Sequence, residues 1–261
     1  MSAGSTSGSD LAVRTVSALV LVTVALAALW AGGIALWVLA SVAAMLMLAE
    51  WGHLVQDDAR HQRLALYAGC VPLAILSPLA AGPSFFALGL LAGTAFFVTI
   101  ITRKPRLGFG IVYVALPAFA LLLLRGQTGG LVLAGWVLGT VWATDIGAYF
   151  AGRSIGGPKL APRVSPNKTW AGLIGGILAA LAVGLALWRW AGLELQLALA
   201  SPILAVIAQI GDLYESWLKR LRGVKDSGSL LPGHGGVLDR LDGLVPVAPA
   251  AAALVLFERF A

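Results

Sequence analysis

Long apolar runs alternate with short polar breaks along the whole chain. A helix needs about 20 apolar residues to cross about 30 Å of hydrocarbon, and runs of roughly that length recur along the sequence. They cover residues 13–30, 33–50, 64–81, 84–101, 107–124, 130–150, 171–191, 194–210 and 243–260. Breaks such as Gly82-Pro83-Ser84 contain the residues that favour turns. The pattern predicts an all-α, polytopic integral membrane protein with about nine transmembrane helices.

Composition supports the same class. Of the 261 residues, 59% are hydrophobic and 11% are charged, whereas a soluble domain carries about 25% charge. An ordinary soluble fold, a disordered chain and a disulfide-rich module are therefore excluded. The single cysteine, Cys70, has no partner for an intramolecular disulfide. We expect one integral membrane domain over residues 1–261.

Basic residues are concentrated on one side of the predicted helices, and this asymmetry predicts orientation, because cytoplasmic loops retain Lys and Arg. Arg125, Arg189 and Arg259 fall on the opposite side. Those on the same side as the N-terminus are Arg14, Arg60, Arg63, Arg103, Lys104, Arg106, Arg153, Lys159, Arg163, Lys168, Lys219, Arg220, Arg222, Lys225 and Arg240. We therefore expect a cytoplasmic N-terminus and an outer C-terminus, in a membrane of the bacterial inner type.

The net charge of +6 follows from this topology and from contact with anionic lipid, so no nucleic-acid partner is expected. One alternative concerns the first apolar run, whose small residues also suit a cleaved signal peptide. Its removal would leave eight helices.

Polar residues divide the chain into two parts. Residues 1–130 carry few polar groups beyond short loops, whereas residues 131–261 carry most of the acids and the two long loops, 151–170 and 211–242. We interpret the first part as scaffold helices and the second as the catalytic half, with an active site facing the cytoplasm.

The first candidate for chemistry is Asp145, near the cytoplasmic end of the sixth predicted helix. Charged residues in membrane helices are costly and mark functional sites by default. Thr144 and Tyr149 add polar groups at helical spacing, which favours a site. The alternative is an acid that only reaches toward the interface.

The second candidate is the loop from Gly152 to Thr169. It is glycine-rich and basic without being a Walker A sequence, which needs Gly-Lys-Ser/Thr after a four-residue spacer. Ser165, Asn167 and Thr169 are expected where the seventh helix begins, so that free backbone amides and Lys168 could bind phosphate. An ordinary basic loop with an N-cap is the alternative.

The third candidate, residues 211–242, is the strongest. Helical spacing puts Asp212, Glu215, Ser216 and Lys219 on one face. The sixth helix ends, the eighth ends and the ninth begins on the same side, so we expect Asp145, Asp212 and Asp239 to converge. Gathered carboxylates beside basic loops suit Mg²⁺ and a polyphosphate substrate. A salt-bridged set of helix ends is the alternative.

At these residues the sequence resembles the phosphatidate cytidylyltransferases, also called CDP-diacylglycerol synthases. The signature fits without a gap from Ser216 to Asp242, and the resemblance extends to Asp145–Tyr149 and Ser165–Thr169. Ala171 stands where many relatives have Glu. The matching positions are Ser216, Lys219, Arg220, Lys225, Asp226, Gly228, Leu231, Pro232, His234, Gly235, Gly236, Asp239, Arg240 and Asp242.

The resemblance implies transfer of the cytidylyl group of CTP to phosphatidic acid, giving CDP-diacylglycerol and pyrophosphate. It also implies Mg²⁺, with room for a second, monovalent cation, and a homodimer. The competing interpretations are another CTP-using lipid enzyme, such as a polyprenol kinase, and a transporter.

Roles for individual residues follow as hypotheses. Asp212, Asp239, Asp145 and Asp226 are the expected metal ligands. The expected catalytic residues are of two kinds. The cations Lys219, Arg220 and Lys225 would offset phosphate charge, and the acids Asp212, Asp226 and Asp239 would act through the metal they hold. The expected substrate contacts are Ser165, Asn167, Lys168, Thr169, Ser216, His234 and Arg240, with an ordinary loop position as the alternative for His234.

Overall fold

The computed structural model describes residues 6–55, 57–228, 230 and 235–260 and is overwhelmingly helical. Within these ranges it contains ten helices and one short hairpin. The helices are α1 (Thr6–Ala31), α2 (Gly33–Leu54), α3 (Ala59–Ile75), α4 (Phe85–Thr102), α5 (Pro105–Arg125), α6 (Gly130–Ser154), α7 (Trp170–Ala191), α8 (Leu195–Leu221), α9 (Leu238–Leu241) and α10 (Leu244–Phe260).

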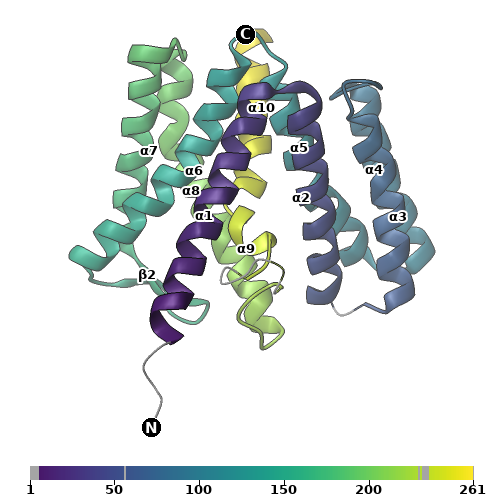
Figure 1. Cartoon of the computed structure of the whole chain (residues 1–261), viewed down its shortest axis with the longest axis horizontal. Coiled ribbons are helices and arrows are strands. Elements are labelled where there is room, and N and C mark those ends of the chain that lie inside the picture. Colours follow the sequence, from purple (N-terminus) through teal and green to yellow (C-terminus); the bar gives the residue numbers. More distant parts are fainter. Residues whose placement is uncertain (1–5, 56, 229, 231–234, 261) are drawn as a thin grey trace.

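The long helices pack side by side at various tilts, and α1 begins at the end of the bundle opposite to the end where α10 finishes (Figure 1). Among the described helices, six are long and apolar enough to span a membrane, namely α2, α4, α5, α6, α7 and α8. Thr15–Ala31 and Leu244–Glu258 are shorter apolar helices. The predicted all-α polytopic membrane fold is thus confirmed, and the count of nine spans stays a prediction.

The core consists of two apolar clusters that meet at α5. One cluster is built mainly from α2, α3, α4 and α5, and the other from α5, α6, α8 and α10. Each contains a fully buried tryptophan whose indole N–H donates a hydrogen bond, as burial requires. Trp51 Nε1 donates to the Arg106 carbonyl at 2.9 Å, and Trp136 Nε1 donates to Ser201 Oγ at 2.8 Å. These bonds fix α2 to α5 and α6 to α8.

A two-stranded antiparallel hairpin joins α6 to α7. Strand β1 (Lys159–Ala161) pairs with β2 (Ser165–Thr169), with Ala161 opposite Ser165 and Lys159 opposite Thr169. The expectation that Ser165 and Asn167 lie at the start of the seventh helix is wrong, because both belong to β2. Pro166 lacks the amide hydrogen of a helix interior but is tolerated in an edge strand.

Thr169 does occupy the predicted helix start. Its Oγ1 accepts a hydrogen bond from the Gly172 amide at 3.0 Å and so caps α7. The hairpin lies at the end of the bundle where α6 and α8 finish (Figure 1). It therefore places Lys168, next to the cap, against α8.

Candidate active site

A polar cavity opens between α6, β2, the first turn of α7 and α8. Its volume is about 610 Å³. Residues from all three sequence regions singled out above line it: Asp145, Tyr149, Arg153, Asn167, Lys168, Thr169, Gln209 and Asp212. Residues that lie more than 60 positions apart in the sequence therefore face one space. Among the predicted site residues, the fold brings Asp145, Asn167, Lys168, Thr169 and Asp212 together here.

Lys168 and Arg153 are the two basic residues that line the cavity, and the contacts of the Lys168 ammonium link β2 to α8. Its Nζ lies 2.5 Å from Asp212 Oδ2 and donates to Gln209 Oε1 at 3.0 Å. Ser216 Oγ donates to the other Asp212 oxygen at 3.3 Å. The pairing holds one carboxylate and one ammonium at the wall, each with part of its surface exposed. Gln209, which is buried, was not among the predicted residues.

The predicted common face of α8 is confirmed by these contacts and by a second pair one turn further on. Lys219 Nζ lies 3.4 Å from Oε2 of the fully buried Glu215. Because side chains at i and i+4 are neighbours on a helix, the spacing alone brings each pair together. The face carries two carboxylates and one ammonium toward the C-terminal end of α8.

Asp242 is an acid that the sequence analysis left out of the site. Gly211 allows its approach, because a Cβ on Gly211 would lie 2.5 Å from the Asp242 carbonyl oxygen and 2.6 Å from Pro246 Cγ. The backbone of α8 therefore touches the turn between α9 and α10. Burial, followed by the negative charge of Asp212, raises the pKa of the Asp242 carboxyl. Its place as the last acid of the motif Asp-Arg-x-Asp was the available signal.

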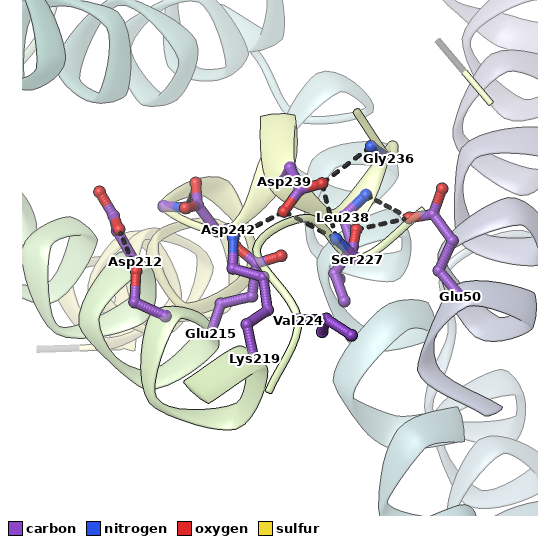
Figure 2. Close-up of polar contacts among 12 residues, drawn as sticks. Glu50, Asp212, Glu215, Lys219, Val224, Ser227, Gly236, Leu238, Asp239 and Asp242 are labelled. Atoms are coloured by element: carbon purple, nitrogen blue, oxygen red, sulfur yellow. Dashed lines mark hydrogen bonds and ion pairs between the residues drawn. The ribbon is translucent and has the colours of Figure 1, made fainter. Parts of the chain in front are cut away.

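Asp239 lies in a different polar environment, shown in Figure 2. Lys219 Nζ donates to its Oδ1 at 2.6 Å, and the amides of Ser227 and Gly236 donate to its Oδ2 at 2.9 and 2.8 Å. Burial alone would raise the pKa of Asp239. The hydrogen bonds from Lys219, Gly236 and Ser227 outweigh burial and hold this pKa below its usual value.

The predicted convergence of the acids is therefore incomplete. Asp145 and Asp212 line the cavity, and, in addition to burial, the negative charges of both raise the pKa of Asp242. Asp239 does not line it and is paired with Lys219 instead. The exposed Asp226 lies near Asp239, since both flank Gly235, whose Cβ would lie 3.5 Å from Asp226 Cβ and 2.8 Å from Asp239 Oδ2.

The remaining predicted residues with described positions do not line the cavity. Arg220 is exposed and directs its guanidinium toward the Val164 carbonyl in the hairpin, with Nε at 3.4 Å. Lys225 and Arg240 are exposed, and Ser165 is half-buried in β2. His234 lies outside the described residues, so its role stays a prediction.

The donor set bears on the predicted metal. In the part of the chain that the structure describes, no three His, Cys, Asp or Glu side chains lie close enough to form a ready-made cation site. Two carboxylates, those of Asp145 and Asp212, nevertheless line the same cavity. Mg²⁺ commonly binds one or two carboxylates and takes its other ligands from water and substrate phosphates, so this donor set fits it.

The helical bundle defines an integral membrane protein, with a cavity lined by charged side chains at one end of the bundle. Comparison with known proteins identifies which kind. A family model described as "Cytidylyltransferase family" matches residues 12–257. The chain belongs to this family.

Named relatives agree. The chain is 42% identical to a phosphatidate cytidylyltransferase of Brucella suis biovar 1, over 95% of this chain and 93% of that protein. It is 41% identical to one of Pseudomonas aeruginosa, over 79% of this chain and 82% of the relative. A Rickettsia conorii phosphatidate cytidylyltransferase is 34% identical over 74% of this chain and 91% of its own length. The predicted family is confirmed.

Proposed function

We propose that this enzyme transfers the cytidylyl group of CTP to phosphatidic acid, forming CDP-diacylglycerol and pyrophosphate. Membership of the family, with relatives named for this activity over most of the chain, carries the proposal. The cavity supports it, because Lys168 and Arg153 supply positive charge and Asp145 and Asp212 supply carboxylates on the same walls. Such a cavity suits a polyphosphate.

The reaction needs little covalent chemistry from the protein. A phosphate monoester has a second pKa near 6, so the lipid phosphate is already a nucleophile at neutral pH. Its oxygen forms a bond to the α-phosphorus of CTP, and the bond from that phosphorus to the oxygen bridging to the β-phosphate breaks. Pyrophosphate leaves with that oxygen and its electron pair. Catalysis can then rest on orientation and on neutralising charge.

The cations on the cavity wall have the clearest role in this scheme. Lys168 is held by Asp212 and Gln209 at the edge of β2, so its ammonium faces the space where phosphates would bind. Arg153, on α6, donates from Nη1 to the Tyr149 hydroxyl at 2.8 Å. We infer that these two side chains bind the triphosphate. Asn167 and Thr169 are the neighbouring polar contacts of the same wall.

Magnesium is the cofactor we propose. Asp145 and Asp212 would hold it, because their carboxylates line the cavity. When bound, it would offset negative charge on the triphosphate. Asp239 and Asp226 remain the other ligand candidates. A second, monovalent cation and a homodimer rest on the family resemblance alone.

Location is also part of the proposal. The cavity lies at the end of α6 and α8 that carries Arg153, Lys219 and Arg220, and basic residues are retained on the cytoplasmic side. We therefore place the active site at the cytoplasmic face of a bacterial inner membrane. There CTP would enter from solvent and the acyl chains of phosphatidic acid from the lipid.

Isotope position tests the chemistry against the polyprenol kinase alternative. The purified enzyme would be incubated with phosphatidic acid or, in parallel, a polyprenol, and with CTP labelled at the α-phosphate or, separately, at the γ-phosphate. Cytidylyl transfer puts the α-label into the lipid product and leaves the γ-label in pyrophosphate. Kinase chemistry would put the γ-label into lipid and would contradict the proposal.

A further inference from the structure

Glu50 joins the first half of the chain to the signature segment of the second. It lies near the C-terminal end of α2 with only 6% of its surface exposed. Its Oε1 accepts from the Val237 amide at 2.9 Å, and its Oε2 accepts from the Leu238 amide at 2.8 Å and from Ser227 Oγ at 3.2 Å. Figure 2 shows the side chain of Glu50 directed at Ser227 and Leu238.

Ser227 and Gly236, which lie beside the Glu50 carboxylate, also bind Asp239. Ser227 donates its hydroxyl to Glu50 and its amide to Asp239, while the Gly236 amide, next to that of Val237, donates to Asp239. The two carboxylates thus bind one loop from opposite sides. Asp239 in turn forms an ion pair with Lys219 of α8, with Nζ 2.6 Å from Oδ1. A chain of contacts therefore runs from α2, through Ser227 and residues 236–239, to α8.

Gly236 packs closely against the Glu50 carboxylate and leaves no space for a side chain there. A Cβ on Gly236 would lie 2.6 Å from Glu50 Oε2, a distance at which the chain or the carboxylate would have to move. A buried carboxylate is costly unless it is hydrogen-bonded. Three donors, from Ser227, Val237 and Leu238, compensate the Glu50 carboxylate, so displacing these residues would leave its charge uncompensated.

We propose that Glu50 is a positioning residue for the reaction: it holds Ser227 and residues 236–239 in the arrangement that presents Asp239 and Lys219 beside the active site. The inference rests on the proposed function for its catalytic consequence. Its structural part does not depend on activity. It states that Glu50 also keeps in place the amides of Ser227 and Gly236, which bind Asp239 and not Glu50. Residues 1–130, which the sequence predicts as scaffold, thereby contribute a side chain to the organisation of the site.

The test uses Glu50→Gln, which keeps the side chain's size but removes its charge and turns an amide NH₂ toward backbone donors. Hydrogen–deuterium exchange, resolved to single amides, is compared in the full-length protein in detergent. We expect exchange to rise about tenfold or more at Val237 and Leu238, because each amide loses its hydrogen bond to a charged carboxylate. The decisive prediction is a comparable rise at Ser227 and Gly236, whose amides bind Asp239 instead.

Steady-state kinetics supply the second readout. We expect kcat with phosphatidic acid to fall about tenfold or more, with KM for CTP changed less than about threefold, because the CTP-facing wall of α6 and β2 does not contact Glu50. Leu36→Ala is the matched control, since Leu36 is a buried residue at the other end of α2. It should lower the melting temperature and leave both kcat and the exchange of Ser227 and Gly236 unchanged.

Several results would overturn the proposal. One is faster exchange confined to Val237 and Leu238. Another is an unchanged kcat in Glu50→Gln with only a lower melting temperature, as in Leu36→Ala. If Glu50→Gln does not fold, Ser227→Ala removes one donor and no charge, and should raise exchange at Gly236, Val237 and Leu238 about threefold or more; unchanged exchange there would count against the idea. A wild-type enzyme that is inactive on phosphatidic acid would refute the proposed function instead. The exchange data would still decide whether Glu50 keeps Ser227 and residues 236–238 in place.

Discussion

Lys168, on the second strand of a hairpin, lies 2.5 Å from Asp212, on the longest helix of the bundle. The two residues are 44 positions apart, and their contact closes the cavity wall between β2 and α8. An ammonium held in this way is positioned before a substrate arrives. Positioned charge needs no reorganisation during the reaction and so stabilises a transition state effectively.

Lys168→Gln should therefore lower kcat/KM about 100-fold or more, the scale found when one preorganised donor is removed. Initial rates of pyrophosphate release at varied CTP measure this loss. Lys159→Gln is the matched control, because Lys159 is exposed on the other strand of the same hairpin and does not line the cavity. Equal losses in the two variants would show that general positive charge, not the position of Lys168, matters.

Asp239→Asn should abolish measurable turnover while the protein stays folded. The substitution keeps one acceptor oxygen for the amides of Ser227 and Gly236 but removes the charge that pairs with Lys219. Turnover and circular dichroism, each measured over a Mg²⁺ titration, would check this. Activity close to that of the wild type would remove Asp239 from the proposed ligand and catalytic residues.

Gly211→Ala should destabilise the protein by about 1–3 kcal/mol, the usual cost of inserting a methyl group into a close contact. The added Cβ would collide with the Asp242 carbonyl and Pro246, and it would push Asp212 away from the turn that carries Asp242. Thermal unfolding in detergent and kcat measure the two effects. Gly89→Ala is the control, since a Cβ there meets no atom within 4 Å; an equal loss in that variant would contradict the packing argument.

Residue accessibility tests the proposed orientation. In a Cys70→Ser background, Arg163→Cys places a thiol in the exposed hairpin turn, and Glu194→Cys places one in the exposed connection between α7 and α8. A membrane-impermeant maleimide applied to right-side-out vesicles should label position 194 and leave position 163 unlabelled. Inverted vesicles should give the opposite result. The reverse pattern would place the cavity on the outer side.

Much of this fold could be predicted because a helix is formed by residues that lie close together in the sequence. Apolar runs predicted nine of the ten described helices, although α8 ends at Leu221, well beyond the predicted run 194–210. Helical spacing predicted the common face on which Asp212 meets Ser216 and Glu215 meets Lys219. The hairpin was missed because β2, with five polar or small residues that include a proline, has no alternation of apolar and polar positions.

Long-range polar contacts could not be predicted in the same way. Glu50 ends an apolar run and finds its donors 177 to 188 positions later, and local periodicity contains nothing about such partners. An acid at the end of a membrane helix was the one available signal. The close approach at Gly211 brings Asp242 near enough to Asp212 for their charges to interact. That approach depends on how α8 and α10 pack, which local periodicity does not show.

The central claim is that the enzyme uses CTP to activate phosphatidic acid. Pyrophosphate release by the detergent-purified protein with CTP and Mg²⁺ tests it most directly, in parallel reactions containing phosphatidic acid, a polyprenol or no lipid acceptor. The account predicts release that depends on phosphatidic acid and equals the CDP-diacylglycerol formed. No release with phosphatidic acid, from protein shown to be folded, would contradict it.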